Sequence, residues 1–260
     1  MKAMIFAAGL GTRLRPLTLE IPKALVEING VTLLEINIRR LIKLFGVTEI
    51  IVNTHHFSEK IEQFLNEKNN FGIRIETSRE IEKPLETGGG LKKAAWFFDD
   101  GKPFFICNAD ILSTIDLNEM LVAHTKSEAV VTYAVQNRDT TRYMLHDQTM
   151  RMCGWMNVKE KKVIFNAHRS LVSDRIKIES ATHHQLLTAD MYSFSCFHVV
   201  NPEIFSTFPP ENYFTIIDWY LRICNEHKIM GYNHSGDAWC DIGTPATLEA
   251  AKDIAATFMA

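Results

Sequence analysis

A glycine-rich segment near the start of the chain carries cations with the chemistry to bind phosphate. Gly9 and Gly11 are separated by one residue, and Arg13, Arg15 and Lys23 follow them. Glycine lets backbone N–H groups approach phosphate oxygens closely, while arginine and lysine add charge-assisted hydrogen bonds. This loop therefore suits a small anionic ligand, and the alternative is a solvated surface loop with incidental charge.

The spacing of the loop differs from two well-known phosphate-binding motifs. The dinucleotide fingerprint GxGxxG needs a third glycine where Leu14 stands, and a Walker A loop needs a lysine directly after its last glycine, whereas Lys23 comes twelve residues after Gly11. What remains is a long loop at the carboxyl edge of a first strand. Open α/β sheets bind their ligands at that edge.

Two aspartates are candidates for binding magnesium. Asp110 follows the apolar stretch 103–107, and Asp241 follows another short apolar stretch at 238–240. A single aspartate at such a place is more often a turn or helix cap. Two carboxylates at strand ends can instead converge on one hard cation, which also takes phosphate oxygens and water.

Three consecutive glycines, Gly88, Gly89 and Gly90, stand at the expected start of a helix. Glycine is a poor helix former, so their presence predicts a close approach to the backbone. A flexible turn is the alternative.

Elements of alternating type must position these residues. Apolar runs alternate with helical spacing through the first half, which predicts a parallel α/β sheet over strands 3–7, 49–53, 73–77 and 104–107, with helices at 33–45, 61–68 and 91–98. The second half predicts further, partly antiparallel strands at 129–135, 142–145, 162–165 and 191–199, then helices near 215–226 and 245–258. We expect one domain, residues 1–260, with halves 1–128 and 129–260.

Composition narrows the class of protein. The chain has 260 residues, 46% of them hydrophobic, and a formal net charge of −3, which favours a folded domain and argues against a nucleic-acid partner. Five scattered cysteines without a CxxC pair predict reduced thiols in the cytoplasm rather than a disulfide framework or a zinc site. Neither a secretory signal nor a membrane segment is expected.

The adjacent pairs His55–His56 and His183–His184 would point to opposite faces of a strand, so no shared metal is expected.

The opening loop also resembles the signature of the sugar-1-phosphate nucleotidyltransferases, or NDP-sugar pyrophosphorylases. The resemblance rests on residues 7–13 (AAGLGTR), 15–18 (RPLT) and 22–23 (PK), and extends to residues 84–92, 106–110 and 239–245. It implies the Rossmann-like fold of that family, a mixed, mainly parallel sheet flanked by helices. The stretch LETGGG looks most like the N-acetylmuramate 1-phosphate uridylyltransferase branch. Such an enzyme supplies precursors for cell wall or other polysaccharides.

The resemblance also implies roles for particular residues. Arg13 would contact the phosphates of a nucleoside triphosphate and Lys23 would stabilise the charge that develops during transfer, with Asp110 the third catalytic residue. Asp110 and Asp241 would hold Mg²⁺. The implied nucleotide-binding residues, with the last three beside the base, are Ala8, Gly9, Gly11, Thr12, Arg13, Lys23, Glu86, Thr87 and Gly88.

Two departures from the family pattern affect the sugar side. Cys196 stands where the family usually has glycine, and the Glu-Lys-Pro triplet that often follows the catalytic aspartate occurs only early, at 82–84. The lysine that meets the sugar phosphate is therefore not identified. Neither the sugar nor the oligomeric state follows from the sequence.

The sequence thus predicts a cytoplasmic enzyme that joins a nucleoside triphosphate, with UTP favoured, to a sugar 1-phosphate and releases pyrophosphate. Within this class the alternative is a mannose-1-phosphate guanylyltransferase, or a relative that uses another acceptor such as phosphocholine. A second alternative is a non-catalytic nucleotide-sugar sensor, against which the intact cations and aspartates argue. A nicotinamide-dependent oxidoreductase would need an acidic residue where Asn53 stands.

Overall fold

The computed structural model describes residues 1–165 and 189–258, so that the pair His183–His184 lies outside the described residues. Its central sheet has ten strands: β1 (Lys2–Phe6), β4 (Glu49–Thr54), β5 (Arg74–Arg79), β6 (Phe104–Asn108), β8 (Val131–Gln136), β9 (Arg142–His146), β10 (Met152–Asn157), β11 (Lys162–Phe165), β12 (Asp190–Val200) and β13 (Ile229–Asn233). Two separate ladders join β2 (Glu27–Ile28) to β3 (Val31–Thr32) and β7 (Ile111–Ser113) to β14 (Trp239–Asp241).

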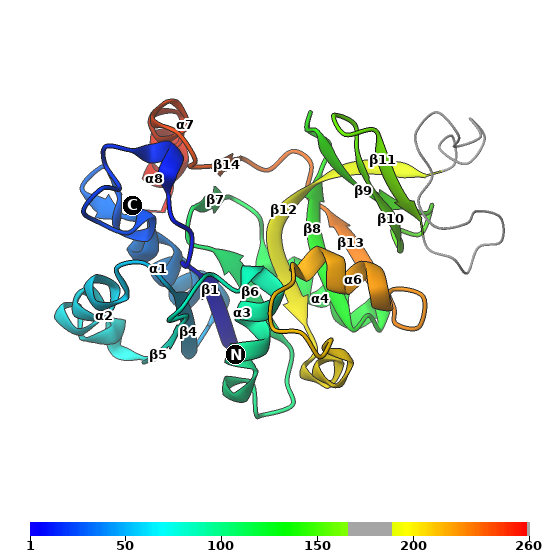
Figure 1. The fold of residues 1–260 in the computed structure, drawn as a ribbon, viewed down its shortest axis with the longest axis horizontal. Helices are drawn as coiled ribbons and strands as arrows, with labels where there is room; N and C mark the ends of the chain where they lie inside the picture. Colours follow the sequence, from blue (N-terminus) through cyan, green and yellow to red (C-terminus); the bar gives the residue numbers. More distant parts are fainter. Residues whose placement is uncertain (166–188, 259–260) are drawn as a thin grey trace.

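Strand direction changes from one half of the sheet to the other (Figure 1). The sheet runs in the order β11-β10-β9-β12-β6-β1-β4-β5, and β8 also pairs with β12 and carries β13. The pairs among β5, β4, β1 and β6 are parallel, whereas β12 is antiparallel to β6, β8 and β9. The predicted mixed α/β sheet flanked by helices is therefore confirmed, including the antiparallel strands of the second half.

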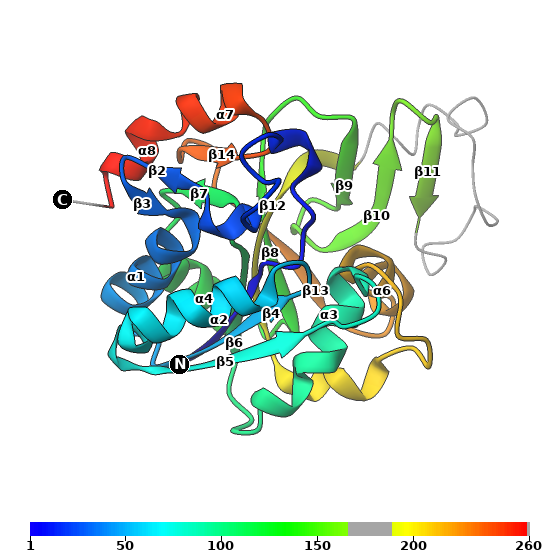
Figure 2. The same cartoon turned by 60° about the vertical axis from the view of Figure 1, so that its left-hand side comes forward.

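Helices cover both faces of the sheet (Figures 1 and 2). Their bounds are α1 (Leu33–Phe45), α2 (Ser58–Glu67), α3 (Glu86–Ala94), α4 (Leu117–Ser127), α6 (Ile216–Ile223), α7 (Pro245–Ala250) and α8 (Lys252–Ala256). Successive residues of a strand point to opposite faces, so Ala3 and Ile5 of β1 pack with α1, α2 and α4, whereas Met4 packs with α3 and α6. Within the described ranges, no helix has the length and apolar character needed to cross a bilayer.

Helix α1 shows why its predicted bounds agree with the structure. The Thr32 side chain accepts a hydrogen bond from the Glu35 N–H, which caps the first turn, and Gly46 ends the helix with φ of 61°. A hydroxyl at the N-cap satisfies an N–H that has no partner inside the helix, and glycine adopts the left-handed conformation readily. Both signals are local and can be read from the sequence.

Other bounds depend on tertiary contacts and differ from the prediction. The helix predicted at 245–258 divides into α7 and α8 at Ala251, and the one predicted at 91–98 begins at Glu86 and ends in a 3₁₀ turn, Ala95–Phe97. Strand β10 was not predicted because Gly154 interrupts its pattern; a Cβ atom there would lie 2.3 Å from the carbonyl oxygen of Ile164 on β11. Helix α4 and strands β2, β3, β7 and β13 were also missing from the prediction, whereas β14 corresponds to the apolar stretch 238–240 that was expected to end at Asp241.

Candidate active site

The glycine-rich loop leaves β1 at the carboxyl edge of the parallel strands and folds back over itself. Gly11 has φ of 63°, and its carbonyl oxygen accepts a hydrogen bond of 2.7 Å from the Thr18 hydroxyl. A Cβ atom at Gly11 would lie 3.1 Å from the Cβ atom of Lys23. Glycine is therefore required here by backbone conformation and by the close passage of the Lys23 segment.

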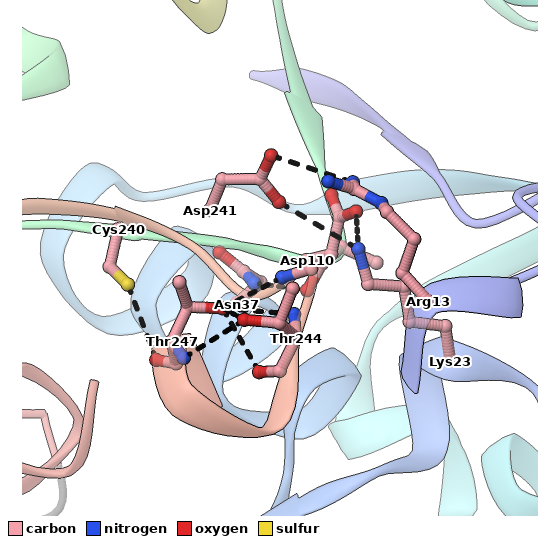
Figure 3. A network of polar contacts seen from close by, with 10 residues as sticks. Arg13, Lys23, Asn37, Asp110, Cys240, Asp241, Thr244 and Thr247 are labelled. Carbon is pink, nitrogen blue, oxygen red and sulfur yellow. Dashed lines mark hydrogen bonds and ion pairs between the residues drawn. The ribbon is translucent and has the colours of Figure 1, made fainter. Parts of the chain in front are cut away.

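Lys23 begins a short 3₁₀ turn, Lys23–Leu25, directly after Pro22. Its side chain is only 11% exposed, and its ammonium nitrogen donates a hydrogen bond to Oδ2 of Asp110 and lies 3.8 Å from Oδ1 of Asp241 (Figure 3). The amine is thus held between two carboxylates, where it partly neutralises both.

Backbone pairing explains why two aspartates so distant in sequence come together. Asp110 directly precedes β7, and Asp241 ends β14, in which it lies opposite Ile111. The N–H of Ile242 donates to the carbonyl oxygen of Asp110 at 2.9 Å and extends this pairing by one step. Asn37 of α1 holds the backbone next to Asp110, since its side-chain amide donates a hydrogen bond to the carbonyl oxygen of Ala109 at 3.0 Å. The convergence predicted for the two carboxylates is what the structure places here.

Arg13 approaches Asp241 from the glycine-rich loop. Its Nη2 atom lies 3.9 Å from Oδ2 of Asp241 and its side chain is 67% exposed, so a large part of the guanidinium is open to a ligand. A Cβ atom at Gly243 would lie 2.7 Å from that same Nη2 atom. The absence of a side chain at Gly243 therefore leaves space for the Arg13 guanidinium.

The segment after Asp241 is held by a capping box. The Thr244 hydroxyl accepts from the Thr247 N–H at 3.2 Å, and the Thr247 hydroxyl accepts from the N–H groups of Gly243 and Thr244, each at 3.0 Å (Figure 3). These bonds fix the start of α7 and with it the backbone on which Asp241 and Gly243 stand.

A cavity of about 450 Å³ opens beside these groups. Its lining includes most of the residues that the sequence proposed: Ala8, Gly9, Gly11, Thr12, Arg13, Lys23, Glu86, Thr87 and Asp110. Asp241 and Gly88 are not among the lining residues. Asp241 contacts the lining cations Arg13 and Lys23, whereas Gly88 lies away from the cavity surface, against Phe214.

The three glycines of α3 accommodate protein atoms. Added Cβ atoms would lie 2.4 Å from the Phe214 ring at Gly88, 2.1 Å from the carbonyl oxygen of Asn212 at Gly89, and 2.9 Å from the Glu80 carboxylate at Gly90. The Phe214 carbonyl oxygen also accepts hydrogen bonds from the N–H groups of Gly88 and Gly89. The close approach to the backbone that the glycines predicted is therefore present, and it is made by other residues of the same chain.

Three further polar residues line the cavity without having been selected from the sequence: Asn53, Glu80 and Asn108. The buried Glu80 carboxylate accepts from the Asn53 amide and from the Leu85 N–H, each at 2.8 Å. Asn108 ends β6, Glu80 follows β5, and Asn53 is the last residue but one of β4, so all three lie at the edge that the topology assigns to ligands. That position was a signal available in the sequence.

The carboxylate pair fits a hard cation such as Mg²⁺. The Oδ1 atom of Asp241 is buried and has no hydrogen-bond partner among the described residues, so it retains capacity for a further electrophilic contact. In residues 1–165 and 189–258, this site included, no three His, Cys, Asp or Glu side chains gather as metal ligands, so the protein would supply two carboxylates here. Magnesium is commonly held by one or two carboxylates, with substrate phosphates and water as the remaining ligands, and Asp110 with Asp241 match that arrangement.

The chain matches the family model described as nucleotidyl transferase over residues 2–257. N-acetylmuramate alpha-1-phosphate uridylyltransferase of Neisseria meningitidis serogroup B is 28% identical over 255 residues, which are 98% of each chain. Mannose-1-phosphate guanyltransferase of Gibberella zeae is 41% identical over 126 residues, and these residues cover 48% of this chain and 34% of that relative. The present chain therefore spans about a third of the fungal relative.

A solved structure gives the same architecture. A putative glucose-1-phosphate thymidylyltransferase from Bacillus anthracis superposes with a TM-score of 0.74 over 98% of this chain and 95% of that one, at 16% sequence identity. At this identity the likeness concerns the fold alone.

Proposed function

The chain belongs to the nucleotidyl transferase family, and on that premise we propose that it transfers the nucleotidyl group of a nucleoside triphosphate to a sugar 1-phosphate. The observation that carries this proposal is the meeting of Arg13, Lys23, Asp110 and Asp241 beside a cavity whose wall is the glycine-rich loop. Cations and carboxylates at one place suit a reaction that concentrates negative charge, and phosphoryl-type transfer depends mainly on positioning and charge neutralisation.

In the proposed reaction, a phosphate oxygen of the sugar 1-phosphate attacks the α-phosphorus in line and pyrophosphate leaves. Arg13 and the loop N–H groups hold the triphosphate, and Lys23 neutralises charge on the phosphate that is transferred. Asp110 and Asp241 would hold Mg²⁺, which supplies electrostatic stabilisation of the phosphate oxygens when bound. Lys23 lines the cavity and contacts both carboxylates, so its positive charge would act on a phosphate bound beside them.

UTP is the proposed nucleotide and an N-acetylmuramate-like sugar phosphate the proposed acceptor. The relative that matches this chain over nearly its full length is a uridylyltransferase, which supports this choice. Residues 1–128 would then bind the nucleotide, and residues 129–260 the sugar phosphate. The 41% identity to a mannose-1-phosphate guanyltransferase within 126 residues favours GTP as the second candidate.

A matrix of nucleoside triphosphates crossed with sugar 1-phosphates tests the proposal by pyrophosphate release. We expect the highest specificity constant for UTP with N-acetylmuramate 1-phosphate. A preference for GTP with mannose 1-phosphate would contradict the proposed substrates but would leave the proposed type of reaction unchanged. Nucleotide or nucleotide-sugar binding without pyrophosphate release in any combination would instead favour the non-catalytic sensor.

A further inference from the structure

Arg138 is a positively charged residue in the second half of the chain, near the strand that carries Asp241. It follows β8 in a short loop, and two hydrogen bonds tie this region to the segment that leads into β14. The N–H of Asn137 donates to the Ser235 hydroxyl at 2.7 Å, and the Gln136 amide donates to the carbonyl oxygen of Asp237 at 3.0 Å. The loop is thereby anchored to the strand that carries Asp241.

The Trp239 ring supports the guanidinium. The Arg138 Cζ atom lies 4.1 Å from the ring centroid, and the ring is itself fixed because its Nε1–H donates to the carbonyl oxygen of Ser195 at 3.0 Å. Stacking on an aromatic face orients the planar guanidinium and leaves its N–H groups directed along its edges. The cation is therefore positioned before any ligand arrives.

No described residue accepts a hydrogen bond from Arg138. Its Nε atom is buried and has no partner, and across residues 1–165 and 189–258 the guanidinium forms neither a hydrogen bond nor an ion pair. A buried donor without an acceptor is unfavourable, and arginine binds phosphate through two parallel N–H···O bonds. A bound anion would satisfy the terminal N–H groups of the guanidinium, which likewise have no acceptor among the described residues.

Strand β14 connects the ring on which Arg138 stacks with the carboxylate of Asp241. Trp239 and Asp241 are two residues apart on β14, so their side chains project to the same face of the strand. The charges of Asp110, Asp241 and Arg138 all act on the thiol of Cys196 on β12. Burial raises the pKa of this thiol, the two carboxylates raise it further, and the Arg138 guanidinium lowers it. Lys23 and Arg13 thus contact Asp241 from the glycine-rich loop, whereas Arg138, in the loop after β8, stacks on a residue of the strand that carries Asp241.

We propose that Arg138, stacked on Trp239, binds the phosphate of the acceptor sugar 1-phosphate. The inference rests on the proposed function and deepens it, because it assigns the cation that the displaced Glu-Lys-Pro triplet leaves unidentified. Held there, the acceptor phosphate would lie between Arg138 and the Asp110–Asp241 pair, with an oxygen directed at the α-phosphorus. Arg138 is a substrate-binding residue in this scheme and takes no part in proton transfer.

Steady-state kinetics of Arg138→Ala and Arg138→Lys test the inference, with UTP and the best acceptor of the substrate matrix. We expect the KM for the acceptor to rise about 10- to 100-fold in Arg138→Ala and less in Arg138→Lys, while the KM for UTP changes less than about twofold. Trp239→Leu should raise the acceptor KM in the same direction, and Trp239→Phe, which keeps an aromatic face, should raise it less. Arg74→Gln removes the same charge at the opposite edge of the sheet and serves as the control.

The reverse reaction and a second acceptor separate the alternatives. In pyrophosphorolysis, Arg138→Ala should raise the KM for the nucleotide sugar and leave the KM for pyrophosphate unchanged. If Arg138 bound a carboxylate on the sugar, its loss would affect N-acetylmuramate 1-phosphate and spare N-acetylglucosamine 1-phosphate, which would overturn the assignment to phosphate. An unchanged acceptor KM in a folded Arg138→Ala enzyme would overturn the inference alone, whereas a wild-type protein inactive with every acceptor would overturn the proposed function.

Discussion

Asp110 and Asp241 are brought together by the backbone, since the N–H next to Asp241, that of Ile242, donates to the carbonyl oxygen of Asp110 at 2.9 Å. The pairing of β7 with β14 sets this register, and the Lys23 amine lies between the two carboxylates. Two side chains 131 positions apart in sequence thereby form one anionic site. Its chemistry and its neighbours lead to the following predictions.

Asp110→Asn and Asp241→Asn should each lower turnover by at least about 100-fold without unfolding the protein, because an amide is a weaker ligand for Mg²⁺ and leaves phosphate charge less neutralised. Pyrophosphate release across a magnesium titration measures the effect, and circular dichroism checks the fold. Asp253→Asn, an exposed aspartate on α8, is the control. Near-wild-type turnover of both variants at limiting magnesium would contradict the metal assignment.

Arg13→Ala and Lys23→Ala should each remove about 3 kcal/mol of transition-state stabilisation, on the scale of one preorganised charge donor. Turnover and triphosphate affinity measured on purified variants provide the test. If neither quantity changed in either variant, the glycine-rich loop would have no part in binding or transfer.

Gly243→Ala should act through Arg13. The new methyl group would meet the flexible end of the Arg13 side chain, so we expect little change in the free energy of unfolding and a loss of kcat/KM smaller than that of Arg13→Ala. In the double variant, Gly243→Ala should have no further effect, since the guanidinium it displaces is gone. Additive losses in this double-mutant cycle would show that Gly243 acts independently of Arg13.

Gly88→Ala should destabilise the protein by about 1–3 kcal/mol, because the added methyl group would overlap the Phe214 ring and its carbonyl oxygen. Urea unfolding measures this change. Phe214→Leu in the same chain should recover part of the loss by making room for the methyl group. The result that would restore a role for Gly88 at the nucleobase is an unchanged stability together with a reduced preference between UTP and GTP.

Two buried histidines should make stability depend on pH. Burial lowers the pKa of His146 to about 4 and that of His198 to about 3, while an exposed imidazole titrates near 6.5. Between pH 6.5 and 4 the unfolded chain therefore binds protons that the folded chain does not, and the free energy of unfolding falls as the pH falls, by an amount on the order of a few kcal/mol.

Urea unfolding of His146→Gln/His198→Gln at pH 7 and pH 5 checks this dependence. Glutamine can still pair with the hydroxyls of Tyr133 and Tyr220, which contact the two imidazoles, so the double variant should lose less stability than the wild type over this interval. The exposed His56→Gln is the matched control. Equal losses in the wild type and the double variant would assign the pH dependence to other groups.

The sequence predicts those parts of the fold and site that local chemistry determines. Helix α1 has its own caps, Thr32 and Gly46, and the loop residues Gly11, Arg13 and Lys23 belong to one continuous segment, so their order and types are sufficient. Glu80 and Asn53 were not selected from the sequence, although both lie near the ends of predicted strands.

Other parts depend on contacts between distant segments. Strands β7 and β14 are three residues each, too short for a periodic pattern, yet their pairing brings Asp241 to Asp110. Gly88 and Gly89 read as an approach to a ligand because the sequence does not reveal that residues 212–214 pack against them. The stacking of Arg138 on Trp239, 101 positions later, is likewise a product of the folded sheet.

Transfer of the α-phosphate from UTP to a sugar 1-phosphate is the central claim, and isotope transfer tests it most directly. UTP labelled with ³²P at the α-position is incubated with magnesium, N-acetylmuramate 1-phosphate and either the wild-type protein or Asp110→Asn. We expect the wild type to move the label into a nucleotide sugar and to release unlabelled pyrophosphate, and we expect Asp110→Asn to produce little of either product. Label that stays in UTP, or appears only in UMP, with this and every other sugar 1-phosphate and nucleoside triphosphate tested in the same way would contradict it.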